Sequence, residues 1–141
     1  MSGYKPITVI IAMFISIGLV SCNQIVNESE TIKMNDLLYK IGEDQPFTGT
    51  VVGKGREDYR RVAYEYKKEY KDGVQDGETV FIYPNGKLES KVPYKNGKVH
   101  GFMMRFWPNG RPRARIHFID GLRGGLRGEM FWDENGHQVK G

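Results

Sequence analysis

The sequence predicts an all-β fold, an elongated antiparallel β-meander built of stacked hairpin repeats. The prediction depends first on a repeat of 24 residues, in which Tyr-Lys-Asp/Asn-Gly-x-x-x-Gly occurs at 70–77 and again at 94–101. Each copy is followed by Pro-Asn-Gly, at 84–86 and at 108–110, and a third, looser copy covers 118–136. Self-similarity at such a period is typical of repeat architectures, whose units stack side by side and present a continuous surface.

Glycine content and alternating polarity are the other two observations behind the fold class. The chain has 18 glycines, and Asn-Gly is the strongest short signal for a two-residue type I′ hairpin turn. In the segments 87–94 and 111–118 apolar and polar residues alternate, as the two faces of a strand require. Asn-Gly occurs at 85–86, 96–97, 109–110 and 135–136.

The first element in the chain is expected to be a cleaved signal peptide over residues 1–21. Lys5 provides a positive start, and an apolar stretch of 14 residues follows from Ile7 to Val20, shorter than the roughly 20 residues of a spanning helix. Leu19-Val20-Ser21-Cys22 resembles the lipobox of bacterial lipoproteins. This resemblance implies that Cys22, the only cysteine, carries the lipid, and a lone thiol also excludes an internal disulfide.

The resemblance to lipoproteins also implies a location. In such proteins an Asp after the lipidated cysteine favours retention in the inner membrane, and this chain has Asn23 there. We therefore expect a lipid-anchored protein on the periplasmic side of the outer membrane. Without Lys5 the net charge falls from +4 to +3 (20 Lys+Arg minus 17 Asp+Glu), a mild excess that favours anionic lipid or an acidic protein over nucleic acid as a partner.

After the anchor we expect two parts. Residues 22–36 comprise the lipidated cysteine and a flexible tether, because they are mostly polar and have no sustained period. Residues 37–141 form the β-repeat domain, since aromatic and β-branched residues with glycine punctuation begin there. The expected strands lie near 37–41, 47–54, 59–70, 78–83, 87–94, 101–107, 111–118 and 126–132.

Two-residue turns would fix which side chains share a face. They would place Tyr83 opposite Leu88, Trp107 opposite Pro112 and Phe106 opposite Arg113. A slip of one residue would exchange the faces. The face expected to be buried carries Phe81, Tyr83, Leu88, Val92, Tyr94, Trp107, Ile116 and Phe118.

The segments Tyr94-Lys-Asn-Gly-Lys-Val-His-Gly101 and Phe106-Trp-Pro-Asn-Gly110 together resemble the bacterial variant of the MORN repeat, found in the antitoxin-like family often labelled YwqK. The resemblance covers roughly 64–138, and Pro46-Phe47-Thr48-Gly49 resembles a common lead-in. It implies an elongated antiparallel meander in which each hairpin stacks on the previous one. Proteins with such repeats include presumed antitoxins, envelope proteins and immunity partners, so the resemblance implies binding and leaves the ligand open.

The residues offer little material for catalysis. After the signal peptide the chain has two serines, Ser29 and Ser90, and three histidines without compact ligand spacing, His100, His117 and His137. The acidic pairs fall in expected loops, where they are solvated turn residues. We therefore expect no enzyme, no cofactor and no metal site.

The best candidates for a partner-binding site form one row on the second face of the expected sheet. Arginine suits carboxylates or phosphates, and aromatic neighbours supply the apolar contact of an interface. The alternative is that the arginines only keep an exposed sheet face soluble and its edges unpaired. The candidate residues are Phe102, Met104, Phe106, Arg113, Arg115 and His117.

Two functions from different classes follow. The first is a non-catalytic immunity or antitoxin protein that sequesters and neutralises a toxin, such as a secreted phospholipase effector. The second is a structural envelope lipoprotein that contacts peptidoglycan, lipopolysaccharide or anionic lipid. A hydrolase of envelope polymers would need converging acid and base residues, which the sequence does not offer.

Overall fold

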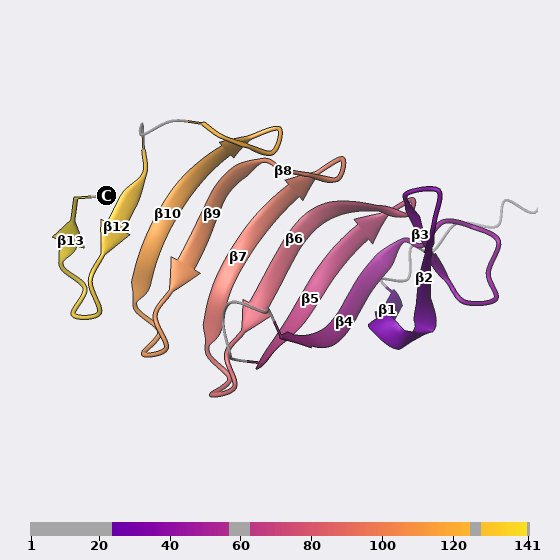
Figure 1. The fold of residues 1–141 in the computed structure, drawn as a ribbon, viewed down its shortest axis with the longest axis horizontal. Helices are drawn as coiled ribbons and strands as arrows, with labels where there is room; N and C mark the ends of the chain where they lie inside the picture. The colour runs from indigo at the N-terminus through magenta and orange to yellow at the C-terminus, as the bar shows by residue number, and fades with distance from the viewer. Residues whose placement is uncertain (1–23, 57–62, 125–127, 141) are drawn as a thin grey trace, which may run out of the picture.

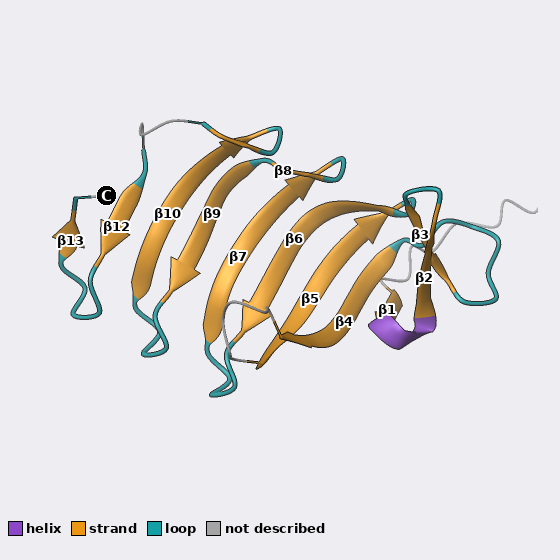
Figure 2. Ribbon diagram, viewed as in Figure 1, coloured by secondary structure: helices purple, strands orange, loops and turns teal. Residues whose placement is uncertain are grey.

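The computed structural model describes residues 24–56, 63–124 and 128–140. Nearly all of these residues lie in strands or tight turns, and 11 strands form one long sheet (Figure 1). The only helical segment in the described part is one 3-10 turn, η1 (Glu28–Glu30), drawn in purple in Figure 2. The predicted all-β hairpin architecture is confirmed.

The strands follow the repeats along the chain. They are β1 (Gln24–Asn27), β2 (Thr31–Met34), β3 (Leu37–Lys40), β4 (Gly49–Arg56), β5 (Ala63–Lys71), β6 (Val74–Ile82), β7 (Leu88–Lys95), β8 (Lys98–Val99), β9 (Gly101–Phe106), β10 (Pro112–Ile119), β11 (Leu122–Arg123), β12 (Met130–Trp132) and β13 (Gln138–Val139).

The sheet is an antiparallel meander with one exception at its N-terminal edge. Its order is β1-β4-β5-β6-β7-β9-β10-β12-β13, so from β4 onward the strands follow one another in sequence order, apart from the short strands β8 and β11. The short strands β8 and β11 pair with β7 and β10 next to the hairpin tips, while β2 and β3 form a separate hairpin. The exception is β1, which pairs with β4 in parallel.

The prediction of a flexible tether over residues 22–36 is wrong for residues 24–36, the part that the structure describes. Residues 24–34 form β1, η1 and β2, and Val26 of β1 lies opposite Val51 of β4. Val26, Val51 and Phe47 are almost fully buried and form a small core, against which Leu38 and Tyr70 pack. Burial of Val26 and pairing of an otherwise open sheet edge explain why a polar-looking segment is ordered.

The expected signal peptide and the expected lipidation at Cys22 lie outside the described residues.

The turns at the two long edges of the sheet are of different kinds. At one edge Asp72, Asn96 and Asp120 each have a φ of 49° and each is followed by a glycine of positive φ. These are two-residue type I′ turns, as predicted for Asn96-Gly97.

At the opposite edge the prediction of two-residue turns is wrong. In the Pro84-Asn85-Gly86 turn the Gly86 amide donates to the Tyr83 carbonyl at 2.9 Å, the Tyr83 amide donates to the Lys87 carbonyl at 2.8 Å, and only the glycine has a positive φ. This is a three-residue loop closed by a glycine bulge. A proline that fixes φ near −65° suits the first central position of the ordinary turn in such a loop. The same bonds recur in the turns at 108–110 and 134–136.

The longer loops change the register that was expected. Ile82 lies opposite Leu88, and Phe106 lies opposite Pro112, so the predicted pairs of Tyr83 with Leu88, Trp107 with Pro112 and Phe106 with Arg113 are wrong. Each register shift leaves one residue in a bulge, Glu89 in β7 and Arg113 in β10. Leu88 therefore moves to the face opposite the one predicted.

Two faces can now be defined. The aromatic face carries the cross-strand row Tyr66, Phe81, Ser90, Arg105, Ala114 and Phe131. The Phe102 face carries the neighbouring row Lys67, Val80, Lys91, Met104, Arg115 and Met130, together with Phe102 opposite His117.

Side-chain hydrogen bonds connect equivalent positions of successive units. Tyr83 donates its hydroxyl to the Phe106 carbonyl at 2.9 Å, and Trp107, 24 residues later, donates its indole N–H to the Trp132 carbonyl at 3.1 Å. Asn85 and Asn109 likewise donate to the carbonyls of Pro108 and Glu134. Each such bond stabilises by about 1 kcal/mol, so the ladder fixes the stacking of the hairpins.

We predict that Gly49→Ala destabilises the sheet strongly. Gly49 has a φ of 152°, and a Cβ there would overlap the Gln24 carbonyl of β1 and the Phe47 ring. The free energy of unfolding in urea should fall by about 2 kcal/mol or more. Gly86→Ala is the control, because a Cβ there meets nothing within 4 Å and only the φ of 79° costs energy, about 1 kcal/mol. Equal losses in the two variants would contradict the close approach of β1.

Candidate binding site

Phe102, Arg115 and His117 form a compact group on the Phe102 face, here called the Phe102 cluster. The Phe102 and His117 rings are stacked, with centroids 4.6 Å apart and an angle of 24° between planes. The Arg115 guanidinium carbon lies 3.8 Å from the centre of the Phe102 ring, a cation–π contact. Phe102 is nevertheless 39% exposed, so it presents aromatic surface flanked by positive charge.

Met104 and Phe106 extend the cluster along β9. Met104 pairs with Arg115 on one side and with Lys91 on the other, and Phe106 lies opposite Pro112. Both side chains are half-buried. Five of the six predicted partner-binding residues therefore share one face of two neighbouring strands.

Arg113, the sixth residue, lies on the aromatic face, so the prediction that it belongs to this row is wrong. It is the bulged residue of β10, and its guanidinium carbon lies 4.3 Å from the centre of the Trp107 ring. Arg113 lines a hollow on the aromatic face together with Ala114 and Phe131. The extra residue in the Pro-Asn-Gly loop causes this change of face, because it forces the bulge.

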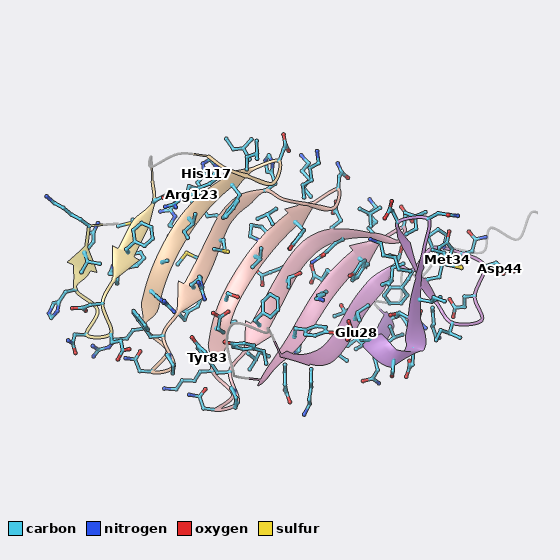
Figure 3. All side chains as sticks on the ribbon, viewed as in Figure 1. Glu28, Met34, Asp44, Tyr83, His117 and Arg123 are labelled. Carbon is cyan, nitrogen blue, oxygen red and sulfur yellow. The ribbon has the colours of Figure 1, made fainter. Side chains whose placement is uncertain are left out.

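An ion pair stands beside the cluster. Arg123 donates from Nε to both carboxylate oxygens of Glu129, at 2.9 and 3.2 Å, and the Glu129 side chain is only 1% exposed. The hydrogen bond from Arg123 is the main cause that holds the pKa of Glu129 below its usual value, and the His117 backbone N–H contributes. Figure 3 shows Arg123 and His117 close together. Arg115 has no carboxylate within ion-pair distance among the described residues, so its charge is available to a partner.

Exposed aliphatic side chains adjoin the cluster at the tip of the β10–β11 hairpin. Ile119 is 47% and Leu122 76% exposed, and the two residues pair across the Asp120-Gly121 turn. A Cβ at Gly124 would meet both the His117 ring and the Ile119 side chain, which places Ile119 next to the cluster. Sequence reasoning missed both residues. Apolar residues on each side of a two-residue turn were the available signal, because turn flanks at a solvated edge are usually polar.

The described part of the chain has no metal-binding centre. No group of three His, Cys, Asp or Glu side chains within it could hold a metal ion. His100 contacts the Asp120 carboxylate at 3.1 Å, and His137 contacts Asp133 at 3.2 Å, so each belongs to the hydrogen bonds of a turn. Across residues 24–56, 63–124 and 128–140, no helix has the length and apolar character to cross a membrane.

The hairpin β6–β7 identifies the class of repeat. Residues 75–96 match the MORN repeat variant, so the chain contains at least one repeat of the MORN type, which supports a MORN-repeat protein. No curated protein and no solved structure is similar enough to the chain to count as a match.

The ion pair between Arg123 and Glu129 leads to a pH prediction. The folded-state pKa of Glu129 is lower than the unfolded one, so the pair stabilises the fold above the unfolded pKa, and this stabilisation is lost as the pH falls through the folded pKa. Carboxyl carbon NMR should find the Glu129 titration midpoint below that of an ordinary glutamate. Arg123→Gln should return the midpoint towards the ordinary value, while Arg123→Lys, which keeps the charge, should return it less. A midpoint that Arg123→Gln leaves unchanged would show that the pair is not formed in solution.

Proposed function

We propose that this chain is a lipid-anchored, periplasm-facing binding protein without catalytic activity, which sequesters a protein partner through the Phe102 cluster. Its role is that of an immunity or antitoxin protein of the YwqK-like kind, which neutralises a toxin such as a secreted phospholipase effector. The observation that carries the proposal is the exposed Phe102 ring between Arg115 and His117.

The composition of this surface supports a protein partner. Interfaces are enriched in aromatic residues, Met and Arg at their centres, and a few such residues contribute most of the binding energy. Here Phe102, Met104 and Arg115 are held in place by cross-strand contacts, and the aliphatic tip with Ile119 and Leu122 adds apolar area at one side. Preorganised side chains lose little conformational entropy on binding.

The charge of the surface favours an acidic patch on the partner. Arg115 faces no carboxylate in the described chain, whereas Arg123 is neutralised by Glu129. One free guanidinium on an apolar surface is suited to recognition of a specific carboxylate. A structural envelope protein that contacts anionic lipid would instead use many weak contacts and would lose binding steeply with salt.

The proposal predicts a partner that depends on the Phe102 cluster. Deletion of the gene should sensitise cells to a toxin encoded next to it, and the purified lipid-free domain should bind that toxin saturably. Phe102→Ala and Arg115→Ala should each weaken binding about tenfold or more in calorimetry. Lys91→Ala is the matched control, because Lys91 lies on the same face but pairs with Glu78.

The outcomes separate the two functions. Survival of the deletion strain beside every toxin candidate encoded nearby would remove the immunity role. Binding to anionic vesicles that falls steeply with salt and responds equally to Lys91→Ala and Arg115→Ala would favour the structural envelope lipoprotein.

The anchor leads to a separate prediction. In a Gram-negative host the mature protein should begin at Cys22 and carry a diacylglycerol on the thiol, with outer-membrane fractionation. Intact-mass spectrometry and labelling with a palmitate analogue measure this directly. Cys22→Ser should abolish labelling and membrane attachment. Retention of residues 1–21, or an unmodified thiol, would overturn the anchor.

A further inference from the structure

Two hollows lie side by side on the aromatic face and share Arg105. The first is lined by Phe81, Ser90 and Met103 among others, and the second, of about 370 Å³, contains Trp107 and Phe131. We call the two hollows together the aromatic trough. It lies on the face opposite the Phe102 cluster, so the inference below goes beyond the proposed function.

The trough is a product of the repeat. Phe81, Ser90, Arg105, Ala114 and Phe131 are direct cross-strand neighbours, so they form a row perpendicular to the strands. The small residues Ser90 and Ala114 are 24 residues apart and alternate with the large ones, which leaves a notch over β7 and another over β10. The two notches are two strand spacings apart, about 9.6 Å.

Basic residues occupy positions of this trough where the preceding repeat has residues that are not basic. Arg105 stands 24 residues after Phe81, at the equivalent position, and its guanidinium contacts the buried Glu89 carboxylate at 2.7 Å. Arg113 stands 24 residues after Glu89, and both are bulged residues turned toward the aromatic face.

The second hollow is electropositive. Arg105, Arg113 and Lys140 line it. Arg105 is paired with Glu89, which lines the adjoining hollow, so Arg113 and Lys140 supply the uncompensated positive charge among the described residues. The Arg113 guanidinium carbon lies 4.3 Å from the centre of the Trp107 ring, and Arg113 has no carboxylate within ion-pair distance in the described chain. A fixed guanidinium beside aromatic and aliphatic walls is suited to a carboxylate on an otherwise apolar ligand.

We propose that the aromatic trough binds an extended, acidic, proline-containing peptide segment in the polyproline II conformation. Such a segment advances about 9.3 Å for every three residues, which matches the spacing of the two notches. Every third residue would then enter a notch, and a carboxylate between them would reach Arg113. Proline-rich segments bind aromatic-lined grooves because their conformation is already fixed and little entropy is lost.

The test uses a fluorescein-labelled peptide of four Glu-Pro-Pro units and the lipid-free chain. Fluorescence anisotropy should show saturable binding. A peptide of four Lys-Pro-Pro units, with the same conformation and opposite charge, and one of four Glu-Gly-Ser units, with the same charge and a flexible chain, should each bind about tenfold more weakly or not at all. Equal binding of either control peptide would overturn the proposal.

Variants then locate the binding. Ala114→Leu, which fills one notch, and Arg113→Gln should each weaken binding about fivefold or more, whereas Arg115→Gln on the opposite face should leave it unchanged. Circular dichroism tests whether each variant folds. If Ala114→Leu does not fold, Arg113→Gln alone tests the proposal. Loss of binding in Arg115→Gln, no loss in Arg113→Gln, or preference for an acidic oligosaccharide over the peptide would overturn the proposal.

Discussion

Contact between successive hairpins is the constraint on which the rest of this structure depends. The described residues form a sheet without a second layer on either face, and the hydrophobic cluster of Val26, Phe47 and Val51 is small. The fold must therefore gain its stability along the sheet, from the backbone ladders and from bonds between equivalent positions such as that of Trp107 to the Trp132 carbonyl. Each unit is held by its neighbours rather than by itself. Among the described residues, both faces of the sheet carry exposed or half-buried side chains, so two separate surfaces can develop on one small chain.

The sequence was sufficient to predict the fold class and the turn type at one of the two long edges of the sheet. Asp72-Gly73, Asn96-Gly97 and Asp120-Gly121 combine two residues that tolerate positive φ, so the type I′ turn follows from local chemistry. At Asn85-Gly86 the same dipeptide lies in a three-residue loop, in which only the glycine has a positive φ and Pro84 occupies the first central position. The one additional loop residue shifts the strand register and produces the bulge at Arg113. The bulge turns the Arg113 side chain to the face opposite that of Arg115 and His117.

Other features could not be read from local patterns. The segment 24–34 is polar, and only its pairing with the edge of β4 and the burial of Val26 make it a strand. The Phe102 cluster was placed on one face because Phe102, Met104, Arg115 and His117 alternate regularly within uninterrupted strands. Arg123 and Glu129 were missed because their approach depends on the chain returning from the β10–β11 hairpin to β12.

The early start of β1 has a mechanical consequence if Cys22 carries lipid as proposed. β1 begins at Gln24, so a single residue separates the acylated position from the sheet. Two residues of extended chain reach at most about 7 Å, which is about the depth of one headgroup layer. Such a protein would have no long linker between the membrane and its sheet. Its first strand would rest at the lipid surface, and a ligand would have to come down to that surface to be captured.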